Sequence, residues 1–467
     1  MKIPAAILSR YRAAHSWLGI MTSSLLFVAF FAGAISVFEQ PLRALTSPIM
    51  TLPAPLPLQD TPRLIKAALQ KYPEIRGNYS IIIQPDAAHP ARMTWSADDD
   101  SGHMWHNDPQ IFAALNADGT LITKQQKEAP IASFIEMLHE TFGLPLPYTL
   151  GDYVMGIVSL LYVVALVSGV VIFLPTIKRN LFSVRLGQHT RKMWRDVHNV
   201  LGLFSLPFHL VIGISAVAFA FHRPIFQVEK ALFTQSVPSS SLRNHYKIPL
   251  TKQGSLSSGH FSSNNVLTPI EVMKIMEAKA PGFNVESLLY TQHAPHALKI
   301  RIIGNDPRYA MRGLNFGFAE MDAHTGALIS TTYLPGHQPL GYMILTFFFA
   351  GHFGSFGGLI TRVSYLILGF AGAFLFYTGN HLWITAQRRK QQANGALCDS
   401  LSLHIISRLA YGWIFGSISG ISLLIIAAII FPDHISLRAA YYIYYITLSL
   451  TIIISLLIKR TYYLKKN

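Results

Sequence analysis

Six histidines lie within or beside apolar stretches of this sequence, and their side chains are the ones best suited to chemistry. They are His15, His139, His198, His209, His352 and His381. Ionisable side chains are costly in hydrocarbon, so those inside a membrane usually point into a helix bundle toward a partner. Imidazole nitrogen is a preferred axial ligand of haem iron, and ligation by two imidazoles suits electron transfer rather than oxygen binding. The histidines therefore indicate haem held among membrane-spanning helices.

Other kinds of metal or redox site are restricted by the single cysteine, Cys398. One thiol excludes a disulfide framework, a four-cysteine zinc or iron–sulfur site and covalent attachment of c-type haem. No glycine-rich nucleotide-binding pattern occurs between a predicted strand and a helix, so we expect no nicotinamide or flavin domain in this sequence. Electrons would then come from a separate donor, a quinol or a cytoplasmic flavoprotein.

The stretch 191–221 carries two of the histidines, His198 and His209, behind a group of arginines and lysines. An α-helix advances 100° and 1.5 Å per residue, so eleven residues would bring the two imidazoles to within about 20° of each other, about 16 Å apart along the axis. We therefore expect one straight helix with both histidines on the same face.

The composition is that of an integral membrane protein, with 51% hydrophobic and only 13% charged residues. The net charge is +15, but Lys and Arg crowd the short segments beside the apolar stretches. That distribution is the positive-inside pattern of membrane proteins and differs from a nucleic-acid-binding face, so we expect no nucleic-acid partner. Membrane lipid is the expected surrounding.

The apolar stretches and basic clusters together predict an all-α transmembrane bundle of about six spanning helices, with both termini in the cytoplasm. Two long polar segments on the other side show features of small α+β domains, including strands at 79–84 and 92–96, a hairpin turn at 116–119, and a helix that begins at Thr61 and Pro62. The predicted divisions are 1–40 for the N-terminus and first span, 41–149 for the first α+β domain, 150–175 for the second span, 176–196 for a basic loop, 197–222 for the third span, 223–339 for the second α+β domain, 340–385 for an interfacial helix and the fourth span, 386–410 for a cytoplasmic loop, 411–458 for the fifth and sixth spans, and 459–467 for a cytoplasmic tail.

The apolar region 340–383 is too long for one straight span. As a continuous helix its residues would extend about 66 Å, more than twice the hydrocarbon thickness. A cluster of glycines at 351, 354, 357 and 358 marks the expected break. We therefore expect an interfacial or re-entrant piece at 340–353 and the span itself at 363–383.

The chain also contains an internal repeat. The pattern R-x-x-H-x-x-x-G occurs at 12–19 and again at 195–202, and a Thr-Pro pair opens each α+β segment at 61 and 268. Leu138-His139 precedes the second span as Gly351-His352 precedes the fourth, and Ser168-Gly169 matches Thr378-Gly379. Each half crosses the membrane twice, so we expect two parallel repeats related by an axis along the membrane normal, with the last two spans outside the repeat.

The histidines could instead be structural. A single histidine at a helix end is more often an interfacial residue than a ligand. Two layers of histidines that recur in both halves favour ligands. Glycines near them would give a macrocycle room, although glycines also serve ordinary helix packing; these are Gly19, Gly169, Gly202, Gly372 and Gly379.

In their order along the chain, these elements resemble the PepSY-associated transmembrane family, which includes iron-regulated inner-membrane proteins and siderophore-iron reductases of the ferrioxamine type. The resemblance covers about residues 1–390, and the last two spans and a serine-rich stretch at 236–265 depart from it. It implies two periplasmic PepSY-like α+β domains and two haem b groups in a multi-pass protein of the bacterial inner membrane. It further implies that electrons pass from the cytoplasmic side to ferric siderophore in the periplasm, which releases Fe(II).

Within that resemblance, repeat symmetry pairs His15 with His198 toward the cytoplasm and His139 with His352 toward the periplasm as ligands of haem iron. His209 and His381 are the alternative ligands. The siderophore would dock between the outer domains, with Trp95, Trp105 and the second α+β domain as its candidate contacts. Two other functions stay open: a non-redox PepSY module that binds or regulates a peptidase or cell-envelope partner, and a transporter, which the lack of acidic residues within the spans disfavours.

Overall fold

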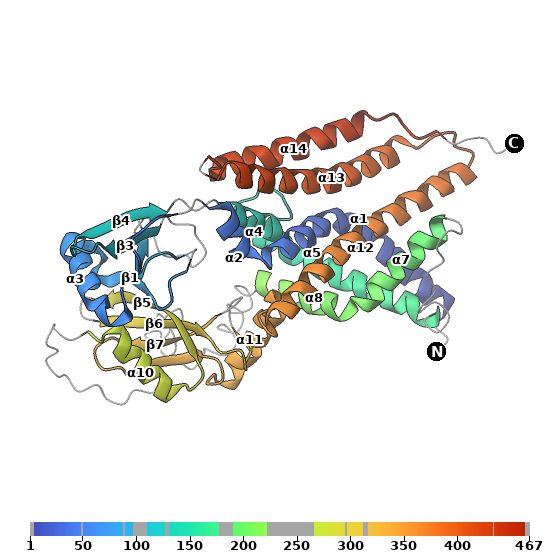
Figure 1. Ribbon diagram of the computed structural model, residues 1–467. Coiled ribbons are helices and arrows are strands. Elements are labelled where there is room, and N and C mark those ends of the chain that lie inside the picture. The colour runs from blue at the N-terminus through green and yellow to red at the C-terminus, as the bar shows by residue number, and fades with distance from the viewer. Residues whose placement is uncertain are drawn as a thin grey trace. The chain divides into compact units, whose positions relative to one another are not determined.

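The computed structural model describes residues 4–47, 50–86, 89–96, 110–126, 130–176, 190–221, 266–294, 297–311, 316–432 and 434–462. The chain forms two compact units (Figure 1). The helical unit comprises residues 1–42, 129–227 and 362–467, and the sheet unit comprises residues 43–128 and 228–361.

The helical unit contains the predicted membrane spans. In the described parts of the chain, five helices are long and apolar enough to cross a membrane, and a bent pair of helices makes a sixth if it is counted as one span. The protein is therefore a multi-pass membrane protein. The helices of this unit are α1 (Ala5–Ser36), α4 (Ile131–Thr141), α5 (Tyr148–Phe173) with the 3-10 turn Leu174–Thr176, α7 (Thr190–Phe204), α8 (Leu206–Ala220), α12 (Gly358–Ala393), α13 (Leu401–Ile430) and α14 (Leu437–Leu457), and α2 (Glu39–Thr46) lies at its boundary.

The bent pair is α7 and α8, whose axes differ by 66°. Pro207 lies in the first turn of α8, where its missing N–H and its ring prevent the helix from continuing straight from α7. Ser205 stands between the two helices. The prediction of one straight helix with His198 and His209 on the same face is therefore wrong, because the two histidines belong to helices that run in different directions.

The last two spans pack against each other and against the rest of the helical unit. Gly412, Gly416 and Gly420 lie at four-residue spacing on α13 and let α14 approach closely, a common way for spanning helices to pack. Tyr444 of α14 is fully buried in a core shared with Phe134 of α4. These helices are therefore an integral part of this unit.

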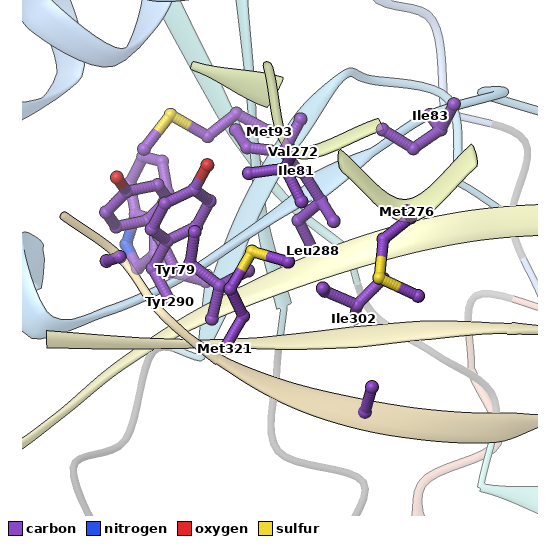
Figure 2. Close-up of a cluster of buried hydrophobic side chains, with 14 of the residues drawn as sticks. Tyr79, Ile81, Ile83, Met93, Val272, Met276, Leu288, Tyr290, Ile302 and Met321 are labelled. Carbon is purple, nitrogen blue, oxygen red and sulfur yellow. The ribbon is translucent and has the colours of Figure 1, made fainter. Parts of the chain in front are cut away.

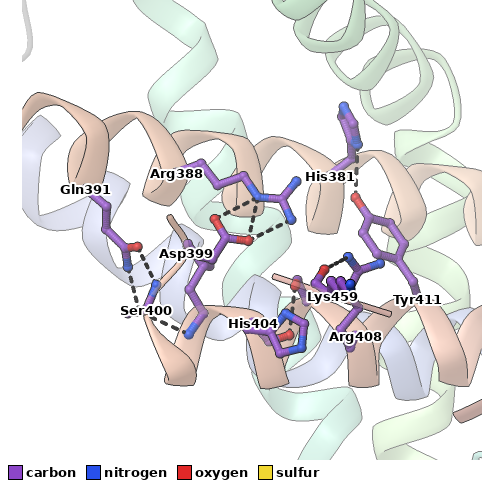
Figure 3. Close-up of polar contacts among 11 residues, drawn as sticks. His381, Arg388, Gln391, Asp399, Ser400, His404, Arg408, Tyr411 and Lys459 are labelled. Atoms are coloured by element: carbon purple, nitrogen blue, oxygen red, sulfur yellow. Dashed lines mark hydrogen bonds and ion pairs between the residues drawn. The ribbon is translucent and has the colours of Figure 1, made fainter. Parts of the chain in front are cut away.

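An ion pair joins the end of α12 to the start of α13. Arg388 Nη2 lies 3.0 Å from Asp399 Oδ2, and the Asp399 side chain is 0% exposed (Figure 3). Removing one partner of a buried pair leaves an uncompensated charge, so this contact holds the end of α12 to the segment that precedes α13.

The sheet unit is built on one antiparallel sheet with the strand order β4-β3-β2-β1-β5-β6-β7-β8. The segments predicted as two α+β domains each contribute four strands, and β1 pairs with β5 to join them. The strands are β1 (Asn78–Ile82), β2 (Met93–Ser96), β3 (Gln110–Leu115), β4 (Leu121–Gln126), β5 (Asn284–Ala294), β6 (Ala297–Asn305), β7 (Gly317–Asp322) and β8 (Leu328–Tyr333). The helices of this unit are α3 (Thr61–Lys71), α10 (Pro269–Lys279) and α11 (Leu340–Phe353), with 3-10 turns at Leu58–Asp60 and Pro73–Gly77.

The core of the sheet unit draws on both halves. Tyr79 of β1 and Tyr290 of β5 are paired across the strands and their rings stack at 4.7 Å. Side chains of α10 and of the neighbouring strands surround them (Figure 2). Trp95 is only 4% exposed in this core, so it cannot serve as the predicted siderophore contact. Trp105 lies outside the described residues.

The helices α3 and α10 both begin at a Thr-Pro pair, but their N-termini are capped differently. Thr268 accepts a hydrogen bond from the Glu271 N–H, and the Glu271 carboxylate accepts from the Thr268 N–H, which forms a complete capping box. In the first half Thr61 is already helical and donates to the Leu58 carbonyl, because a 3-10 turn precedes it. The predicted start of this helix at Thr61 and Pro62 is confirmed.

The long apolar region breaks at the predicted glycines. α11 ends at Phe353, and the C-cap residue Gly354 has a φ of 64°. Gly357 and Gly358 also have positive φ values, which favour glycine. α12 begins at Gly358. The region therefore forms a short apolar helix followed by a spanning helix.

Candidate functional site

His15 of α1 and His198 of α7 lie opposite each other in the helical unit. Their ring centroids are 6.3 Å apart and the ring planes are inclined by 71°. These are the two histidines of the repeated R-x-x-H-x-x-x-G pattern. The fold thus brings together one predicted ligand from each half of the repeat.

The tautomer of His15 follows from its hydrogen bond. Its Nδ1 lies 2.9 Å from the Ala165 carbonyl of α5, and a carbonyl oxygen can only accept. Nδ1 therefore carries the hydrogen, and Nε2 carries the lone pair that a metal requires. Ser168 donates to the same carbonyl at 2.8 Å and lies 3.4 Å from His15 Nδ1.

His198 is held in the same tautomer by a hydroxyl. Thr378 Oγ1 of α12 donates its hydrogen to the Leu375 carbonyl at 2.7 Å. Since that hydrogen is committed, the oxygen can only accept from His198 Nδ1, which lies 2.9 Å away. A metal-bound imidazole usually donates its second N–H to such an oxygen, which fixes the ring orientation.

The groups that orient the two rings occupy matching positions of the repeat. Gly169 follows Ser168 and lies against His15, where an added Cβ would be 3.0 Å from Cε1. Gly379 follows Thr378 and lies against His198, where an added Cβ would be 3.4 Å from Cε1. These two glycines let each imidazole approach the backbone of the neighbouring helix. The orienting role of the hydroxyls was missed, although a hydroxyl before each repeated glycine was visible in the sequence.

The spacing of the two rings suits a pair of imidazoles that share one metal ion. A metal–imidazole bond would be about 2.0 Å and the nitrogen lies about 1.1 Å from its ring centre, so two imidazoles bound to one metal would have ring centres up to about 6.2 Å apart. Ordinary edge-to-face packing of two rings gives similar centroid distances. It does not explain why the Nδ1 atoms of both histidines are hydrogen-bonded to other helices. A Cβ added at Gly19 would meet no described atom within 4 Å. A Cβ added at Gly202 would meet only the Leu375 side chain, at 3.6 Å or more. His15 and His198 therefore fit a haem iron with room beside them.

His209 of α8 is a second candidate ligand. It is fully buried, its Nδ1 lies 2.6 Å from the Tyr162 hydroxyl, and its Nε2 has no partner among the described residues. A buried polar atom without a partner is costly and needs an explanation. The repeat gave His209 no support, because Leu26 stands at its matching position. The structure supplies that support through the orphaned nitrogen.

His139 and His352 were predicted to pair. His139 lies in the last turn of α4, where its Nδ1 donates to the Ala29 carbonyl of α1 at 2.7 Å, and Gly33 leaves space for the ring. His352 lies in the last turn of α11, with its ring 5.6 Å from that of Phe353. The two histidines belong to different units, and their pairing stays a prediction.

His381 of α12 lies in an aromatic environment. Its Nδ1 is 3.0 Å from the Tyr411 hydroxyl of α13, and its ring is 5.0 Å from that of Trp194 on α7 (Figure 3). Across the described part of the chain, no three His, Cys, Asp or Glu side chains gather into a metal-binding group. A paired-imidazole site is thus the arrangement to which the described histidines are best suited.

The chain matches a known protein family. The family described as the PepSY-associated TM region matches residues 12–386, about four fifths of the chain. The matched region includes all six predicted histidines and ends within α12, before α13 and α14. Among proteins of curated function, none matches the chain.

Proposed function

Because the chain belongs to the PepSY-associated TM region family and sets two histidines of matching repeat positions face to face, we propose that it is a dihaem b-type reductase. In this proposal it spans the bacterial inner membrane with both termini in the cytoplasm. It passes electrons across the membrane to ferric siderophore in the periplasm and releases Fe(II).

The observation that carries the proposal is the common tautomer of His15 and His198 at a spacing of 6.3 Å. These two residues would hold one haem, which supplies one-electron chemistry when bound. The Ala165 carbonyl and the Thr378 hydroxyl hold the two Nδ1–H groups and so keep both Nε2 atoms available to iron. His139 and His352 would hold the second haem, with His209 as the alternative.

Reduction is a chemically sensible way to release the iron. The oxygen donors of a siderophore are hard ligands that hold Fe(III) far better than the softer, less charged Fe(II). One electron per ferric ion is therefore enough to weaken the complex. In the proposed orientation, the basic segments beside the spans lie in the cytoplasm and the sheet unit receives the siderophore in the periplasm.

An absorption spectrum of the full chain purified in detergent tests the proposal. We expect a haem Soret band and α bands that sharpen when dithionite is added. His198→Ala should remove about half of the haem signal, whereas His434→Ala, at an exposed turn, should leave it unchanged. A folded but colourless protein would refute the proposal and favour the non-redox module that binds a peptidase or cell-envelope partner.

A further inference from the structure

A histidine and a tyrosine form a polar pair inside an aromatic cluster of the helical unit. His381 Nδ1 of α12 lies 3.0 Å from Tyr411 Oη of α13, and both side chains are only partly buried. Figure 3 shows the two side chains pointing toward each other from neighbouring helices. Such a pair needs a reason to stand on spanning helices, where polar side chains are costly.

The rings around this pair form an open apolar surface. Trp194 lies 5.0 Å from His381, and Tyr377 stacks on His381 at 6.3 Å and lies 6.2 Å from Tyr411. Phe374 and Phe415 continue the cluster and are 42% and 48% exposed. Exposed apolar rings on spanning helices face lipid, so a molecule dissolved in the bilayer can reach the pair from the side.

The pair offers the same hydrogen-bonding capacity in either tautomer. If His381 Nδ1 donates to Tyr411, then Nε2 is an acceptor and the tyrosine hydroxyl is a donor. If the tyrosine hydroxyl donates to Nδ1, then Nε2–H is a donor and the tyrosine oxygen is an acceptor. One donor and one acceptor therefore face outward in both cases. A quinone carbonyl needs the donor, and a quinol hydroxyl needs the acceptor.

The cluster also lies close to the paired histidines. Trp194 and His198 are four residues apart on α7, which places them about one turn, or about 6 Å, from each other along the axis. His198 in turn bonds Thr378, three residues before His381 on α12. An electron that leaves a molecule bound at the cluster would thus start beside one of the proposed ligands.

We propose that His381, Tyr411 and the rings around them bind a lipid-soluble quinol, which is the electron donor of this protein. The inference rests on the proposed function, because it supplies the electrons that the reductase requires. Each quinol gives up two electrons and two protons and leaves as quinone. The electrons pass one at a time and reduce two ferric ions to Fe(II), and the protons are released to water. His381 is therefore assigned to the donor site rather than to haem.

Direct binding of a short-chain quinone tests the site without relying on turnover. Decylubiquinone should quench part of the tryptophan fluorescence of the full chain in a saturable way, and Trp194→Phe should remove most of that quenched part. Tyr411→Phe and His381→Leu should each weaken binding about tenfold, the change expected when a hydrogen bond of about 1.4 kcal/mol is lost. Tyr442→Phe is the matched control, because Tyr442 is 61% exposed on α14 and should bind quinone as the wild type does.

Haem reduction separates the failure of this inference from the failure of the proposed function. Decylubiquinol should reduce the wild-type haem faster than it reduces Tyr411→Phe, while dithionite reduces equal amounts of haem in both. A haem protein that binds no quinone, or whose Tyr411 and His381 variants bind it like the wild type, would overturn the quinol site and leave a flavoprotein as donor. A haem-free protein that still binds quinone through these residues would overturn the reductase but keep the site.

Discussion

The hydrogen bond between Thr378 and His198 allows a quantitative test of the paired site. Thr378→Val keeps the side-chain shape and the β-branch but removes the hydroxyl oxygen that lies 2.9 Å from His198 Nδ1. Thr378 is 0% exposed, so water cannot easily replace that oxygen. The imidazole N–H would then keep only the Leu375 carbonyl as an acceptor.

The expected magnitude follows from what such bonds contribute in membranes. Polar contacts between spanning helices average about 0.6 kcal/mol and reach about 1.7 kcal/mol. A buried donor left wholly without a partner would cost about 1–3 kcal/mol, but the Leu375 carbonyl remains as an acceptor for His198. We therefore expect Thr378→Val to lower the free energy of unfolding by about 1 kcal/mol. Thr378→Ser, which keeps the hydroxyl, should lower it by less than about 0.5 kcal/mol.

The matching residue of the first half makes the test sharper. Ser168 Oγ lies 3.4 Å from His15 Nδ1, and the Ala165 carbonyl at 2.9 Å is the stronger acceptor. Ser168→Ala should therefore cost less than Thr378→Val, although the repeat places them at matching positions. Unfolding titrated with denaturing detergent measures all three variants. Equal stability of the valine and serine variants, or a larger loss in Ser168→Ala, would contradict the geometry described for the pair.

Three further predictions concern other parts of the molecule. Gly372→Ala should lower the free energy of unfolding by about 1–3 kcal/mol, because its Cβ would lie 2.5 Å from Phe30 and 2.9 Å from His209. Gly19→Ala, whose Cβ would meet no described atom within 4 Å, should be neutral or slightly stabilising. Thermal unfolding compares the two variants, and equal losses of stability would count against this packing. Asp399→Ala should lower the free energy of unfolding by about 2–3 kcal/mol, because it leaves Arg388 without its buried partner. In the same assay Lys390→Gln, at an exposed position, should leave the free energy of unfolding unchanged. Burial raises the pKa of Glu286, so the folded state keeps this proton to a higher pH than the unfolded state does. The free energy of unfolding should therefore fall as the pH rises above about 4.3. Glu286→Gln should flatten that part of the profile of stability against pH, and an unchanged slope would show that another group is responsible.

Local patterns in the sequence were enough to predict most of the elements. The spans follow from apolar length and flanking charge, and the division between α11 and α12 follows from glycines that adopt positive φ at 354, 357 and 358. The hairpin between β3 and β4 follows from its turn, in which Gly119 has a φ of 85°. Each of these signals acts over a few residues, so the surrounding structure does not change its meaning.

The features that were missed depend on contacts between distant segments. The pairing of β1 with β5 joins residues about two hundred positions apart, and each strand alone has the same pattern whichever neighbour it finds. The bend between α7 and α8 had a local signal in Pro207, but the continuous apolar run concealed it. The hydroxyl of Thr378 is one of many in the spans, and only the folded arrangement shows that it faces His198.

The pairing of β1 with β5 has an evolutionary consequence. A single half would present β1 or β5 as an open edge with unpaired backbone groups, which invites association with another copy. Two identical halves that joined antiparallel at this edge would form the symmetric strand order seen here. The present chain is therefore built like a homodimer whose two subunits are joined in one polypeptide. Fusion allows each half to change independently, so one can specialise in recognising a ligand while the other keeps the sheet intact.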